Sequence, residues 1–225
     1  MNKMSKMFRF VVTFILLCNI GIAKAQNRDD HLKPVSGIFA QYDYQFEYYS
    51  RVRKVLFSGL SDKPEIRFQV MPSFSPENVL DIEFDRDNNK YYITYHICEQ
   101  MIWYNENWEN VKVQKFKTEI NRESVKLIKS LFSIAIAQVR FPPNIVDENG
   151  MVLITLRADG ENYYFTVNEF GIKSGTVWSP SKGTKMEKLA DIGNKLIELA
   201  KLERGIVEFD KKLQEEIEEL IHKLK

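Results

Sequence analysis

Two residues of this 225-residue chain have the types and the spacing of a cysteine nucleophile and its base. His96 and Cys98 stand two apart in an apolar segment that alternates as a strand, so their side chains point to the same face. A thiol beside an imidazole is the minimum for nucleophilic catalysis by cysteine. No orienting residue, oxyanion site or cysteine-protease signature accompanies the pair. We therefore interpret both as packing residues and predict no catalytic residue.

A second group of residues has part of the spacing of a calcium loop. Asp85, Asp87 and Asn89 occupy its first, third and fifth positions. Lys90 stands where the loop needs glycine, and His96 where it needs a bidentate glutamate. The three histidines of the chain also match no zinc signature. The sequence predicts a solvated turn at 85–89, no metal and no cofactor.

Aromatic residues supply the third candidate site. Trp103, Tyr104 and Trp108 stand among the Asn and Glu residues of 105–110. Exposed rings beside amides and carboxylates can stack on a sugar, or they can anchor a protein partner, where Trp and Tyr are favoured. The alternative is that the tryptophans fold back and close the edge of the core, since Trp is well buried on average. We predict Trp103, Tyr104 and Trp108 as ligand-binding residues, with a glycan or a protein of the cell envelope as the partner.

The first 25 residues have the pattern of a cleaved signal peptide. A basic start is followed by an apolar run over 10–22 and by Ala23-Lys24-Ala25, a small-x-small cleavage pattern. The apolar run is shorter than the ~20 residues that span a bilayer. Leucines precede Cys18, where a lipidation site needs small residues. We expect an exported protein that starts at Gln26, without a lipid anchor, in the periplasm or outside the cell.

Removal of residues 1–25 changes the charge and the cysteine count. The remaining 28 Lys and Arg against 31 Asp and Glu give a net charge of −3, with no basic block of the kind that nucleic-acid binders carry. Cys18 leaves with the leader, so Cys98 is alone and no intramolecular disulfide can form. Core packing must then supply the stability that disulfides give many exported proteins.

Periodicity predicts the elements that position these residues. Strand patterns cover 66–71, 79–84, 91–97, 102–104, 111–116, 151–158, 161–167 and 172–178. The polar residues 85–89 predict a hairpin turn, and Asp159-Gly160 predicts a type I′ turn that joins 151–158 to 161–167. Residues 26–36 are polar and predict a loose arm.

Helical stripes predict the remaining elements. Residues 42–48 alternate as a strand, but the three- and four-residue steps from Phe39 to Leu56 last longer, so a helix is favoured there. Further helices are expected over 122–139, capped by Asn121, over 185–202, and from about 213 to Leu224. The pattern predicts one α+β domain over 26–225. Its sheet is mainly antiparallel, helices pack on one face, and two helices close the chain.

Three short patterns also carry a family resemblance. They are Pro72-Ser73-Phe74-Ser75-Pro76-Glu77, then Asp159-Gly160 with Tyr163-Tyr164-Phe165, then Gly175 with Trp178-Ser179-Pro180. Together they resemble a group of small exported proteins from Bacteroidetes-type bacteria. The resemblance implies an envelope or extracellular setting and carries over no catalytic residue.

The sequence as a whole predicts an exported, non-enzymatic binding or interaction protein. Two alternatives stay open at this point. One is an immunity-type protein that inhibits a toxin in the envelope, and the other is a hydrolase that uses His96 and Cys98 or a pair of carboxylates.

Overall fold

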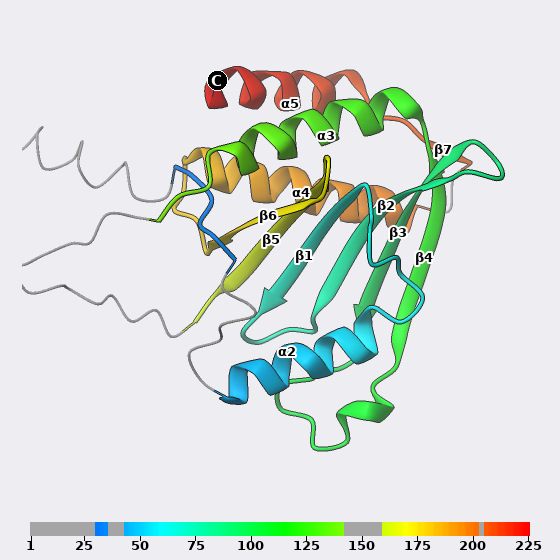
Figure 1. The fold of residues 1–225 in the computed structure, drawn as a ribbon, viewed down its shortest axis with the longest axis vertical. Helices are drawn as coiled ribbons and strands as arrows, with labels where there is room; N and C mark the ends of the chain where they lie inside the picture. Colours follow the sequence, from blue (N-terminus) through cyan, green and yellow to red (C-terminus); the bar gives the residue numbers. More distant parts are fainter. Residues whose placement is uncertain (1–29, 36–42, 142–158, 203–204) are drawn as a thin grey trace, which may run out of the picture.

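The computed structural model describes residues 30–35, 43–141, 159–202 and 205–225 (Figure 1). The predicted signal peptide lies outside these residues. Their strands form one seven-stranded sheet in the order β6-β5-β1-β2-β3-β4-β7. The strands are β1 (Ile66–Pro72), β2 (Asn78–Asp85), β3 (Lys90–Cys98), β4 (Val113–Ile120), β5 (Glu161–Asn168), β6 (Ile172–Trp178) and β7 (Ile206–Val207). All neighbouring pairs are antiparallel except β4 with β7, so the predicted α+β class with a mainly antiparallel sheet is confirmed.

The helices lie on both sides of this sheet. Figure 1 shows α3 (Arg122–Ala137), α4 (Lys185–Lys201) and α5 (Lys211–Leu224) in the upper half of the view, and α2 (Asp43–Leu56) at the bottom. Helices α3 and α4 contact the strands, and α5 packs on both of these helices. The two predicted C-terminal helices are therefore confirmed. Helix α2, which the stripe ending at Leu56 predicted, lies on the opposite face, so the helices do not all pack on one face as predicted.

Side-chain alternation along β1 separates two hydrophobic clusters. Phe68 and Val70 point into the main core beneath α3, α4 and α5. Met71 points the other way, into a smaller cluster with Val52 and Leu56 of α2. Because successive strand residues face opposite sides of a sheet, one strand serves both clusters. The smaller cluster fixes α2 across the ends of the central strands.

Local signals set the helix ends. Asn121, Thr184 and Asp210 are N-caps, and each side chain accepts a hydrogen bond from the backbone N–H three residues on. The cap at Asn121 was predicted. Helix α2 confirms the choice of helix over strand for its described residues, since an amphipathic stripe of this length outweighs a short alternation.

The predicted strand at 102–104 is wrong. These residues form a turn, which is followed by the 3-10 helix η1 (Trp108–Asn110). Ile102 is fully buried, and its backbone N–H is bound by the carboxylate of Glu77 rather than by a neighbouring strand. The next strand, predicted at 111–116, is β4 and runs from Val113 to Ile120.

The predicted hairpin of 161–167 with 151–158 is also wrong. β5 is hydrogen-bonded to β1 on one edge and to β6 on the other, so neither edge is left for a hairpin partner. Residues 151–158 lie outside the described part of the chain. The partners of β5 are set by the order of strands in the sheet, and the Asp159-Gly160 dipeptide does not predict them.

Residues 30–35 are not a loose arm. Lys33 exchanges two backbone hydrogen bonds with Thr176 of β6 (2.8 and 2.9 Å), and the side chain of Leu32 is fully buried. Gly175 leaves room for this contact, since a Cβ atom there would lie 2.9 Å from Leu32 Cδ1. The segment therefore covers part of the β6 edge.

Candidate functional site

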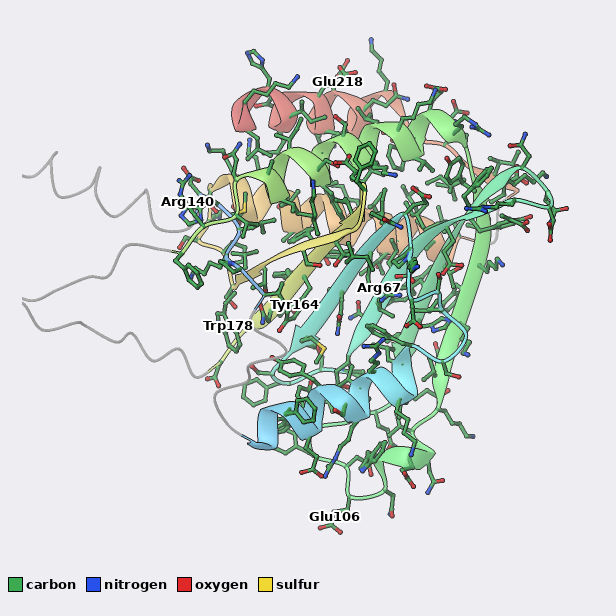
Figure 2. The ribbon with its side chains drawn as sticks, in the orientation of Figure 1. Arg67, Glu106, Arg140, Tyr164, Trp178 and Glu218 are labelled. Atoms are coloured by element: carbon green, nitrogen blue, oxygen red, sulfur yellow. The ribbon has the colours of Figure 1, made fainter. Side chains whose placement is uncertain are left out.

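A pocket of about 340 Å³ opens between α2 and the adjoining ends of the central strands. Five separate segments supply its walls, and six of the side chains, from four of these segments, are aromatic. The aromatic pocket, as we call it, is lined by Tyr48 and Tyr49 of α2, by Met71 and Pro72 at the end of β1 with Ser73 and Phe74 after it, by Trp103 and Tyr104, by Asp159 and Asn162 at the start of β5, and by Trp178 at the end of β6. In Figure 2 the labelled Trp178 and Tyr164 lie above α2.

The rings of the aromatic pocket face in different directions. The ring of Trp103 is perpendicular to that of Tyr48, with an angle of 89° and 4.6 Å between centroids. It is also nearly perpendicular to that of Tyr104, at 85° and 6.4 Å. Trp103 and Tyr104 are 42% and 63% exposed, and Phe74 is 68% exposed. The rings therefore form walls around a space open to solvent rather than one flat platform.

One buried carboxylate joins two of these walls. The side chain of Glu77 accepts a hydrogen bond from the Tyr48 hydroxyl (2.8 Å) and bonds from the Ile102 N–H to both of its oxygens (3.2 and 3.0 Å). Glu77 is 1% exposed, and burial together with this carboxylate raises the pKa of Tyr48. The carboxylate thus fixes α2 relative to the turn that carries Trp103 and Tyr104.

A chain of hydrogen bonds lies at the base of the aromatic pocket. The hydroxyls of Tyr49 and Tyr164 are 3.1 Å apart, and Asn162 Nδ2 donates to the Tyr164 oxygen (2.7 Å). The Thr176 hydroxyl donates to Asn162 Oδ1 (2.6 Å). Burial raises the pKa of Tyr164, so its hydroxyl stays protonated.

The wall that carries Trp178 is held by a close backbone approach. Ser73 donates its backbone N–H and its hydroxyl to the Gly160 carbonyl (both 2.9 Å). Gly160 has φ 147°, and a Cβ atom there would lie 2.0 Å from Ser179 Oγ and 2.9 Å from Trp178 Nε1. Only glycine satisfies both conditions. The three short motifs at 72–77, 159–165 and 175–180 therefore meet at the aromatic pocket.

The charge of the aromatic pocket is one-sided. Of its described lining residues, Asp159 alone carries a carboxylate, and none is Lys, Arg or His. Asp159 forms no hydrogen bond or ion pair with the other described residues. A bound cation would find a negative charge here that no described basic group neutralises.

The structure places two of the three predicted ligand-binding residues in the aromatic pocket. Trp103 and Tyr104 line the aromatic pocket, whereas Trp108 lies in η1 and packs against the smaller cluster. The Trp108 ring is covered by Arg51 and Lys54, whose charged atoms lie 5.5 and 5.1 Å from its centroid. Trp108 therefore joins η1 to α2 and contributes no pocket wall.

His96 and Cys98 lie on the face of the sheet that α2 covers, and both are buried. Burial raises the pKa of the Cys98 thiol to about 12, and the Glu77 carboxylate adds to this effect. The imidazole Nδ1–H of His96 donates to the Leu56 carbonyl (2.9 Å), and burial lowers the pKa of His96. A protonated, buried thiol is a poor nucleophile, so the arrangement favours packing over catalysis.

The polar atoms of the 85–89 turn are already engaged. Asp85 accepts bonds from the backbone N–H groups of Asp87 and Asn88 and from the Asn88 amide. These bonds lower the pKa of Asp85. Asn89 accepts from Arg122 (3.0 Å). In the part of the chain that the structure describes, no three His, Cys, Asp or Glu residues are placed to hold a metal.

Sequence reasoning missed most walls of the aromatic pocket. Tyr48 appeared only in a strand-like alternation, Tyr49 only in a helical stripe, and Trp178 only as a strand end. Phe74 and Asp159 stood in turn motifs. The available signal was that each of the three motifs places an aromatic residue within three positions of Gly or Pro.

Comparisons with known proteins give no relative from which to transfer a function: no family model, curated protein or solved structure matches the chain. Among the described residues, no helix is long and apolar enough to cross a bilayer.

Proposed function

We propose that this chain is an exported, non-enzymatic binding protein of the cell envelope and that the aromatic pocket is its ligand site. The observation that carries the proposal is the convergence of six aromatic side chains from four segments on one open pocket. Ligand sites are concave and mainly apolar, with a few polar groups that orient the ligand. The aromatic pocket has this composition.

The way the walls are held supports the same proposal. Glu77 and Gly160 fix two walls through buried hydrogen bonds and a close backbone contact, although Trp103 and Tyr104 themselves are exposed. Binding to rings that are already held in place costs little conformational entropy, because the site is formed before the ligand arrives. Rings that only closed the core would be buried.

The setting of the proposal rests on the N-terminal pattern of residues 1–25. Fractionation of the native host, with intact-mass analysis of the recovered chain, tests it. We expect a chain that starts at Gln26 in the envelope or medium. A soluble cytoplasmic chain that retains Met1 would contradict export.

Binding is tested with the purified chain, a glycan array, a peptide panel and an extract of the cell envelope, read by native mass spectrometry. We expect a ligand that is lost in Trp103→Ala and retained in Trp108→Phe, the matched tryptophan outside the aromatic pocket. Equal binding by both variants would place the ligand elsewhere. The absence of any Trp103-dependent ligand would contradict the proposed function.

A further inference from the structure

We propose that the aromatic pocket recognises an alkylated ammonium group, such as the trimethylammonium head of a choline-like ligand. This inference rests on the proposed binding function and adds the chemical class of the ligand. Three features of the aromatic pocket carry it: the mutual orientation of the rings, the one-sided charge and the engagement of the polar lining groups.

Ring orientation favours a rounded cation over a flat sugar. The faces of aromatic rings carry partial negative charge and attract a cation placed over them. Trp103 makes an edge-to-face contact with Tyr48 (4.6 Å between centroids, 89°) and is nearly perpendicular to Tyr104 (85°), so the three rings form no single flat platform and their faces point in different directions. A sugar that stacks through one face needs a single platform, whereas a trimethylammonium group contacts walls on several sides.

The charge of the lining points the same way. Asp159 supplies a carboxylate, and no described lining residue is basic. Asp159 is exposed, so solvent weakens its attraction for a cation, but the sign of the interaction still favours a cation over an anion. An anionic ligand would meet Asp159 without any cationic partner among these residues.

The polar groups are largely engaged before a ligand arrives. The Tyr48 hydroxyl is bound to Glu77, that of Tyr49 to Tyr164, and that of Ser73 to Gly160. A sugar brings many hydroxyls, and each one buried without a partner costs binding energy. A fully alkylated ammonium has no N–H group that needs an acceptor. It therefore loses no binding energy when the polar groups of the pocket are already hydrogen-bonded to one another.

The size of the aromatic pocket fits a small group. Its volume of about 340 Å³ is at the lower end of the range for ligand pockets. The same ammonium head can belong to a free solute or to a lipid headgroup, and the experiment must distinguish these two sources.

Isothermal titration with choline chloride, tetramethylammonium chloride and 3,3-dimethyl-1-butanol tests the inference. Dimethylbutanol replaces the charged nitrogen of choline with carbon and is otherwise matched in shape. We expect choline to bind at least about tenfold more tightly than dimethylbutanol, because the ring faces and Asp159 act only on the charge. Equal affinities, or no binding of either ammonium compound, would overturn the inference.

Variants test whether choline binds in the aromatic pocket. We expect Trp103→Ala to abolish choline binding and Asp159→Asn to weaken it several-fold while leaving dimethylbutanol unchanged. Trp108→Phe should bind as the unmodified chain does, and circular dichroism of each variant checks that it is folded. Choline binding that survives Trp103→Ala would contradict the site. In an otherwise folded chain, an unchanged affinity in Asp159→Asn would contradict the role of the carboxylate.

Co-sedimentation with vesicles distinguishes the two sources. Trp103-dependent binding to phosphatidylcholine vesicles but not to phosphatidylglycerol vesicles would place the ammonium on a lipid, and binding of free choline alone would place it on a soluble ligand. Both results support the inference. A glycan or peptide that binds in a Trp103-dependent way while choline does not would overturn the ammonium assignment and leave the proposed binding function intact.

Discussion

The hydroxyl of Tyr48 donates a 2.8 Å hydrogen bond to the buried carboxylate of Glu77. These residues are 29 positions apart, and their bond ties α2 to the turn after β3, because the same carboxylate also binds the Ile102 N–H. Two walls of the aromatic pocket therefore depend on one side chain that does not itself line the pocket.

Replacement of Glu77 should destabilise the protein in proportion to the hydrogen bonds lost. Glu77→Ala leaves a half-buried phenol and a buried N–H without their acceptor, and we expect a loss of about 2–4 kcal/mol in the free energy of unfolding. Glu77→Gln keeps one acceptor oxygen and should lose about 1 kcal/mol. Urea unfolding measures both values.

The control for the two Glu77 variants is Glu106→Ala. Figure 2 places Glu106 at the outer tip of the loop that leads to η1. Its removal should change the free energy of unfolding by no more than about 0.5 kcal/mol. Equal effects of Glu77→Ala and Glu106→Ala would mean that the Glu77 contacts do not support α2.

Buried His96 should make the protein less stable in mild acid. Burial lowers its pKa in the folded state and Lys115 adds to this effect, while the hydrogen bond to the Leu56 carbonyl and the Glu83 carboxylate act in the opposite direction without reversing it. The unfolded chain then binds more protons below the ordinary histidine pKa of about 6.5, so stability is full above that pH and falls as the pH decreases. A tenfold difference in proton affinity corresponds to about 1.4 kcal/mol.

The measurement is urea unfolding of the unmodified chain and of His96→Gln at pH 7.5 and pH 5. The glutamine amide can still donate a hydrogen bond to Leu56 but does not titrate. We expect the unmodified chain to lose more stability between the two pH values than the variant does. The same pH dependence in both proteins would show that His96 binds protons equally in the folded and unfolded states.

The thiol of Cys98 should be unreactive in the folded protein. Burial raises its pKa to about 12, so the thiolate that attacks an alkylating reagent is scarce at pH 8. We expect iodoacetamide to modify Cys98 at least about 100-fold more slowly in buffer than in guanidinium chloride. Peptide mass spectrometry follows the reaction. Comparable rates would indicate an accessible thiol and favour the hydrolase interpretation.

Leu32 should contribute to stability although it lies near the N-terminal end of the described residues. Its side chain is fully buried against Gly175, whereas Val35 is 38% exposed. We expect Leu32→Ala to lower the free energy of unfolding by about 2–4 kcal/mol. Val35→Ala, the matched control three residues on, should change it by at most about 0.5 kcal/mol. Equal effects would mean that the 30–35 segment is not docked on β6.

Local patterns in the sequence were enough to predict most helices and strands. Alternation identified β1, β2 and β3, helical stripes identified α3, α4 and α5, and Asn121 marked the start of α3 correctly. These signals depend on residues at most a few positions apart, and the α+β class followed from their order along the chain. The candidate site was only partly predicted, through Trp103 and Tyr104.

The strand neighbours and the aromatic pocket could not be predicted from local patterns, because they depend on contacts between distant segments. β5 pairs with β1, almost a hundred residues earlier, and Trp178 reaches the same pocket as Tyr48. Such contacts depend on which surfaces of a whole sheet remain to be covered, and local periodicity contains no information about them. Glu77 illustrates the reason: its carboxylate acts between two segments that meet only after the sheet has formed.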